Sequence, residues 1–97
     1  MSKLLLSTDT LQGYGLNRIF AFVKDAGFDG VDLSIELKDF DTQNVEYIKS
    51  LSAQYDLPVL SIQTPTNATA KTVLHAVDMA KALGVKVIII QPPKLLN

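Results

Sequence analysis

The sequence predicts an α/β fold in which three strand–helix units and a fourth strand, a parallel (βα)3β4 unit, form a single sheet. Two observations support this prediction. Short apolar runs containing Leu-Ser recur at a spacing of 27 residues, at Leu6-Ser7, Leu33-Ser34 and Leu60-Ser61. The segments between these runs have the periodicity and the end residues of helices. Strands that alternate with helices of this length form right-handed crossovers and hence a parallel sheet.

Four strands are expected, and the first three contain the repeated dipeptide. They span Lys3 to Thr8, Val31 to Ile35, Val59 to Gln63 and Lys86 to Gln91. The fourth follows the third at nearly the same interval and is almost wholly aliphatic at its centre. Short runs of this composition are typical of parallel strands that are buried on both faces.

Three helices are expected between the strands. The first spans Leu16 to Ala26 and stops at Gly27, where a left-handed C-terminal cap fits. The second begins at Asp41 or Thr42 and stops before Leu57-Pro58, because the residue ahead of a proline avoids helical angles.

The third helix is expected to begin near Thr66 or Asn67 and to end at Gly84. Each helix carries an apolar stripe that predicts its buried side. In chain order the expected inward positions are Ile19, Phe20, Phe22 and Val23, then Val45, Ile48, Leu51 and Ser52, then Val73, Val77, Ala80 and Leu83.

The composition is that of a soluble globular protein, and residues 1–97 are expected to form one domain. Apolar residues make up 47% of the chain and charged residues 20%, and no apolar run approaches the ~20 residues of a membrane-spanning helix. Cysteine is absent, which excludes disulfides and thiolate metal sites and suits a cytoplasmic protein. The formal net charge is −1 with no basic stripe, so neither nucleic acid nor a membrane is an expected partner.

Candidate site residues lie at the carboxyl ends of the strands, where parallel α/β folds bind ligands. Alignment of the repeats places a polar residue at each of these ends, namely Asp9, Glu36, Gln63 and Gln91. Strict alternation along the second strand puts Asp32, Ser34 and Glu36 on one face, opposite the residues that face the helices. A polar inner face of this kind suits a polyhydroxylated ligand.

Each candidate also has a purely structural interpretation. The serines of the repeat, Ser7, Ser34 and Ser61, are expected to be small packing residues inside the sheet. Asp9 could be a turn residue, and Glu36 could be the solvated start of a loop. Asp32 is the strongest candidate, because an acid within an apolar strand is costly to bury without a partner.

Two other features are given no catalytic role. His75 is the only histidine and is expected to be exposed to solvent, on the side of the third helix away from the apolar stripe. The Gly13-Tyr14-Gly15 segment precedes a helix and could cradle an anion. It lacks the spacing of a phosphate-binding fingerprint, so a flexible loop is expected there.

The segment from Ala26 to Leu33 reads Ala-Gly-Phe-Asp-Gly-Val-Asp-Leu and resembles the second-strand region of xylose-isomerase-like barrels. This superfamily includes sugar phosphate isomerases/epimerases and AP-endonuclease family 2-like enzymes. Residues 57–62 are similar to its third strand, and residues 80–92 are similar to its third helix and fourth strand. The resemblance spans essentially the whole chain. It implies the N-terminal half of a TIM (β/α)8 barrel, ending just after the fourth strand.

The resemblance also implies an activity. Full-length members bind a divalent metal and isomerise or epimerise a small sugar or sugar phosphate. Asp32 matches the second-strand acid of the family, which is commonly Glu. Gln63 and Gln91 stand where many members have histidines, and a neutral amide cannot act as an imidazole base.

No catalytic residue and no metal ligand is assigned in this chain. The family's principal metal ligands and catalytic glutamates lie on later strands, so the 97-residue chain is expected to be inactive alone. Both edge strands of the predicted sheet have unpaired backbone groups. These would be covered by a missing C-terminal half or in a homo-oligomer.

Two alternatives remain open. One is a half-barrel that pairs with a second copy to close a barrel with a binding or structural role. The other is a small doubly wound domain of flavodoxin or response-regulator type, which would have helices on both faces of the sheet.

Overall fold

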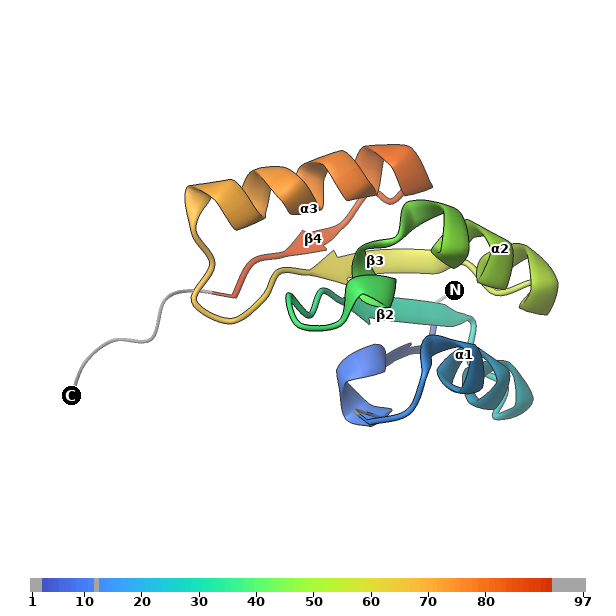
Figure 1. The fold of residues 1–97 in the computed structure, drawn as a ribbon. Coiled ribbons are helices and arrows are strands. Elements are labelled where there is room, and N and C mark those ends of the chain that lie inside the picture. The colour runs from blue at the N-terminus through green and yellow to red at the C-terminus, as the bar shows by residue number, and fades with distance from the viewer. Residues whose placement is uncertain (1–2, 12, 92–97) are drawn as a thin grey trace.

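The protein folds as a parallel sheet of four strands in the order β1-β2-β3-β4, with one α-helix between each consecutive pair (Figure 1). The computed structural model describes residues 3–11 and 13–91. The strands are β1 (Leu5–Ser7), β2 (Gly30–Ser34), β3 (Val59–Gln63) and β4 (Ile88–Ile89). The helices are α1 (Leu16–Asp25), α2 (Val45–Tyr55) and α3 (Ala70–Leu83), with short 3-10 helices η1 (Thr8–Leu11) and η2 (Phe40–Gln43). The predicted α/β class and (βα)3β4 order are confirmed.

The three α-helices form a single layer against the sheet. Helix α1 contacts α2, and α2 contacts α3, and Figure 1 shows all three on the same side of the strands. Right-handed crossovers between strands in strictly sequential order give this arrangement. A doubly wound domain needs helices on both faces, so the described residues do not support that alternative.

The two edge strands are shorter than predicted. Strand β1 covers Leu5–Ser7 and β4 covers only Ile88–Ile89. Each pairs with a single neighbour, so residues at its ends lack the second ladder that would hold them extended. The end of β4 is still anchored, because the Gln91 carbonyl accepts a hydrogen bond of 3.0 Å from the Ala68 N–H.

The start of helix α2 differs from the prediction. Asp41 and Thr42 belong to η2, and α2 begins at Val45, with Asn44 as its N-cap. The Asn44 carboxamide oxygen accepts a hydrogen bond of 3.1 Å from the Tyr47 N–H. A tight turn bonded to the Asp39 carboxylate uses the residues that the sequence pattern assigned to the helix.

The start of helix α3 also differs. The N-cap is Thr69, which forms a capping box with Thr72, whereas Thr66 or Asn67 was predicted. Asn67 instead has a positive φ of 57°, which a turn residue can adopt and a helical residue cannot. The predicted ends of the first and third helices, at Gly27 and Gly84, are confirmed, because both glycines have positive φ values, of 85° and 72°.

Helix α3 is rotated relative to its predicted buried stripe. Ala76, Met79 and Ala80 are buried, whereas Val73 and Val77 are only half-buried. This rotation places His75, next to the buried Ala76, at the border of the buried face. The expectation that His75 is exposed is therefore wrong, since it is half-buried and its Nε2 atom is inaccessible to solvent.

The core lies between the sheet and the helix layer. One predicted core residue, Phe22, is exposed, and Leu16 of the same helix is buried in its place. The largest fully buried side chains include Phe20, Leu33, Ile35, Ile48, Leu57 and Ile62.

An irregularity in the pairing of β2 with β3 sets which residues lie side by side. Val31 pairs with Val59, but Asp32 pairs with Ser61, so Leu60 has no partner. A Cβ atom on Gly30 would lie 2.7 Å from the Pro58 carbonyl oxygen and 2.8 Å from Leu60 Cδ1. Only glycine lets the two strands approach this closely, as at other bulges.

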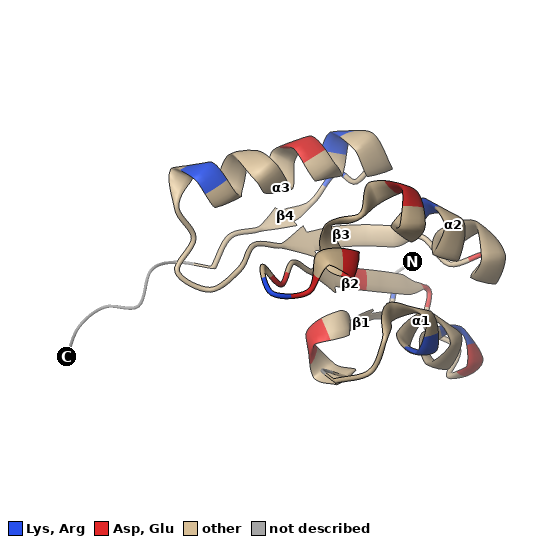
Figure 2. Cartoon of the chain, viewed as in Figure 1, with Lys and Arg blue, Asp and Glu red and all other residues tan. Residues whose placement is uncertain are grey.

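Charged residues are mixed in sign over the helices and loops (Figure 2). Strand β3, by contrast, consists of neutral residues only. Among the helices of residues 3–11 and 13–91, none combines the length and the apolar character needed to cross a bilayer.

Candidate functional site

A row of polar side chains crosses the sheet on the face away from the helices. The register aligns Ser7 of β1 with Asp32 of β2, and Asp32 with Ser61 of β3. Gln63 closes β3, and Gln91 follows β4. Because side chains alternate along a strand, the residues between them point to the opposite, helix-covered face. We call Ser7, Asp32, Ser61, Gln63 and Gln91 the polar row.

Asp32 is the charged centre of the polar row. Its side chain is buried, with 7% of the residue exposed. The Ser61 hydroxyl donates to Oδ1 at 2.6 Å, and the Gln63 amide Nε2 donates to Oδ2. These two bonds account for a carboxylate within a strand whose other residues are apolar or small, because burial of an acid is tolerated when both oxygens are bonded.

The two glutamines extend the row from β3 to β4. The Gln91 Nε2 atom donates to the Gln63 Oε1 atom at 2.7 Å. The main chain of Gln91 is held in turn, because its N–H donates to the Thr64 hydroxyl at 2.8 Å. On the other side, Gln63 Nε2 lies 3.4 Å from the Ser7 hydroxyl oxygen. The row is therefore continuous from the first strand to the fourth.

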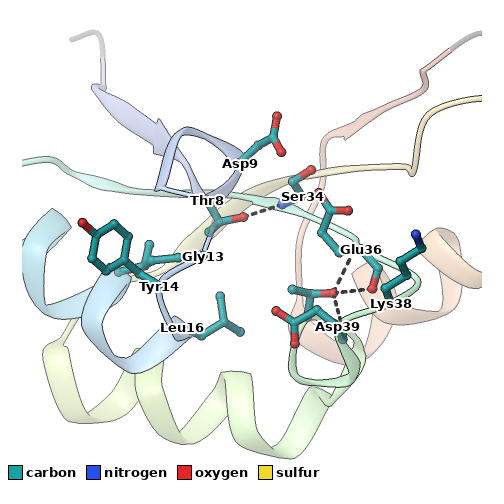
Figure 3. Close-up of a pocket in the computed structure, with 11 residues that line it drawn as sticks. Thr8, Asp9, Gly13, Tyr14, Leu16, Ser34, Glu36, Lys38 and Asp39 are labelled. Carbon is teal, nitrogen blue, oxygen red and sulfur yellow. Dashed lines mark hydrogen bonds between the residues drawn. The ribbon is translucent and has the colours of Figure 1, made fainter.

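A separate pocket of about 290 Å³ lies beside the carboxyl ends of β1 and β2 (Figure 3). Figure 3 shows Tyr14 and Leu16 across this pocket from Glu36. The buried Thr8 hydroxyl accepts a hydrogen bond of 2.9 Å from the Ser34 N–H and so joins η1 to β2.

The loop after β2 is held by a second threonine. The Thr42 hydroxyl accepts a 2.9 Å hydrogen bond from the Glu36 N–H and donates to the Asp39 carbonyl oxygen at 2.8 Å. Threonines are common, and no sequence pattern identified Thr8 or Thr42 as site-forming residues. Their role follows from the way η1 and η2 fold back toward β2.

The structure divides the predicted site residues into two groups. Asp32, Gln63 and Gln91 are brought together by direct hydrogen bonds. Asp9 and Glu36 instead line the pocket. Asp9 lies in η1 rather than at the end of a strand, and its N–H donates to the Ser7 hydroxyl at 3.2 Å.

The repeated serines do more than fill space. Ser7 and Ser61 both belong to the polar row through their hydroxyl groups. The spacing of 27 residues marks these two serines, but it marks Ser34 equally, and the register places Ser34 level with Gln63. Ser7 on β1 and Ser61 on β3 lie on the two strands that flank β2, and the register places both level with Asp32.

The polar row offers one carboxylate, two amides and two hydroxyls. These groups suit hydrogen bonding to ligand hydroxyls, each of which can donate and accept. Amides are poor ligands for a transition metal. Among the described residues, no three His, Asp or Glu side chains are grouped as metal ligands.

No family model matches the chain. It is 28% identical over 100 residues to an uncharacterized protein of Mycobacterium leprae (strain TN). It is 27% identical over 100 residues to uncharacterized proteins of Mycobacterium bovis and Mycobacterium tuberculosis. These matches cover 94% of this chain but only 35% of each relative, so the chain spans about a third of the length of the proteins that it matches.

Proposed function

We propose that this chain is the N-terminal part of a sugar phosphate isomerase/epimerase-like TIM (β/α)8 barrel, and that its polar row binds hydroxyl groups of a small sugar. The observation that carries the proposal is the continuous bonding of Asp32, Gln63 and Gln91 on the face that no described helix covers. In a closed barrel this face lines the interior. Gln63 and Gln91 would lie at its carboxyl-terminal mouth, where barrel enzymes bind their substrates.

The strand order supports the barrel part of the proposal. A barrel of this type continues one sequential parallel sheet, with its helices in an outer ring, and β1 to β4 with α1 to α3 have this order. The remaining strands would cover the open edges of β1 and β4. In this proposal the catalytic groups and the ligands of a divalent metal lie on those later strands. This chain alone is then inactive, and the full-length protein acts on its sugar in the cytoplasm.

A second candidate is a homodimer in which two half-barrels close one barrel with a binding or structural role. The observation that favours it is the apolar surface at both edges of the sheet, where Leu4 is 66%, Val87 52% and Ile90 54% exposed. A two-fold axis along the barrel would place β4 of one copy beside β1 of the other and keep all strands parallel. Exposed strand edges of this kind readily pair with another strand.

Sugar binding can be tested on the 97-residue chain by NMR. Titration with D-ribose should shift the side-chain amide signals of Gln63 and Gln91 in a saturable way. Gln63→Leu should abolish the shift at Gln91, because the amide that links Asp32 to Gln91 is lost. The same substitution at Gln54, an exposed residue of α2, should leave binding unchanged. Shifts confined to residues outside the polar row would refute the proposal.

A further inference from the structure

The hydrogen bonds of the polar row have a direction that Asp32 sets. An ionised carboxylate only accepts hydrogen bonds, so Gln63 must turn its NH2 group toward Asp32 and its carbonyl oxygen away. That oxygen can only accept, so Gln91 must turn its own NH2 group toward Gln63, as the 2.7 Å bond shows. The Gln91 carboxamide oxygen is then left at the open end of the row. The charge of Asp32 on β2 thus orients the amide of Gln63 on β3 and the amide of Gln91 just after β4.

Gln91 stands at the end of the polar row, and part of the hydrogen-bonding capacity of its side chain is unused. In the described structure the Gln91 side chain makes one hydrogen bond, through Nε2 to Gln63. Its carboxamide oxygen and its second N–H are therefore available to a ligand. A hydroxyl group matches this pair, because it can donate to the oxygen and accept from the N–H. A phosphate dianion has no proton to donate and would leave the Gln91 oxygen unsatisfied, which is costly.

The charge of Asp32 also favours an uncharged ligand over a phosphate. Both bonded partners of Asp32 are neutral, and no basic side chain of the described residues pairs with it. In Figure 2 the neighbouring strand β3 carries no charged residue. The negative charge of Asp32 is therefore compensated by hydrogen bonds but not by a cation. In a partly desolvated site it repels an anionic group over several ångströms.

We propose that the polar row selects an uncharged polyol or sugar over its phosphate ester, with Asp32 as the positioning residue and Gln91 as the ligand-contacting residue. This inference rests on the proposed function and narrows its substrate class from sugar or sugar phosphate to the uncharged sugar at this site. A phosphorylated sugar would have to place its phosphate away from the row.

The test compares D-ribose with D-ribose 5-phosphate on the same chain, with dissociation constants taken from the Gln63 and Gln91 amide signals. D-ribose should bind about tenfold or more tightly, which corresponds to about 1.4 kcal/mol. Asp32→Asn should bring the two constants closer together, because the charge is gone and both amides are free to turn. Asp25→Asn removes the same charge from the exposed end of α1 and should leave the ratio unchanged.

Salt provides a test that needs no variant. Raising the ionic strength from about 0.02 to 0.5 M should weaken the discrimination, because a shorter Debye length screens Asp32 from the ligand phosphate. If these amide signals gave an equal or lower dissociation constant for D-ribose 5-phosphate, the proposed selectivity would be wrong, but sugar binding by the polar row would still stand. If neither sugar shifts these signals, the proposed function fails as well. Saturable shifts with inorganic phosphate alone would also overturn the inference.

Discussion

The Ser61 hydroxyl lies 2.6 Å from Oδ1 of Asp32, on the neighbouring strand. This contact exists because the irregular pairing between β2 and β3 skips Leu60 and brings Ser61 level with Asp32. With regular pairing, Leu60 would stand beside the carboxylate. A one-residue shift in register therefore decides whether this buried acid meets a hydroxyl or a methyl group.

Ser61→Ala should destabilise the fold by about 1–3 kcal/mol, because it leaves one oxygen of a buried carboxylate without its donor. Urea denaturation monitored by circular dichroism measures this change. Ser50→Ala is a suitable control, since Ser50 is exposed and its hydroxyl bonds only the Tyr47 carbonyl of its own helix. Equal midpoints for the two variants would show that the Asp32 contact contributes nothing to stability.

Gly30→Ala should also be destabilising, by about 2 kcal/mol or more, because the new methyl group overlaps the Pro58 carbonyl oxygen. The backbone of β3 would have to move, and the alignment of Ser61 with Asp32 would be disturbed. At Gly15, an added Cβ meets no atom within 4 Å, so Gly15→Ala should cost less than about 1 kcal/mol, the scale of an N-cap preference. If Gly30→Ala proved as mild as Gly15→Ala, close strand approach would not be the reason for this glycine.

Two substitutions at the N-terminus of α3 can distinguish the observed N-cap from the predicted one. Thr69→Ala should lower the free energy of unfolding by about 1 kcal/mol, because the hydroxyl that accepts from the Thr72 N–H is lost. Thr66→Ala, at the position that the sequence pattern favoured, should have little effect, since Thr66 is exposed and precedes the helix. The reverse order of the two effects would place the start of the helix where the pattern predicted it.

The open edges of the sheet lead to a prediction about assembly. If two half-barrels associate, Val87→Lys should return the dimer to a monomer in light scattering after size exclusion, because a charge beside β4 opposes pairing of strand edges. Leu74→Lys introduces the same side chain at an exposed position of α3 and should leave the molar mass unchanged. A monomeric wild-type chain would refute the homodimer and leave the longer barrel as the remaining candidate.

Much of the fold could be predicted from local pattern, because strand, helix and stop residues each act over a few positions. The order of elements and the helix ends at Gly27 and Gly84 followed in this way. Helix starts were less predictable. At η2 and at Asn67, a turn competes with the helix for the same polar residues, and only the surrounding contacts decide between them.

In the candidate site, too, some features could be predicted from the sequence and others required the tertiary structure. The strand ends of the repeat singled out Gln63 and Gln91 without any structure. Asp32 stood out as an acid within an apolar strand, which is costly to bury without a partner. The separation of Asp9 and Glu36 into a pocket, the bond from Ser61 to Asp32 and the burial at His75 required the tertiary structure. Each depends on how one element is shifted or rotated against another. Packing across the sheet and the helix layer sets such shifts, and no local run of residues encodes them.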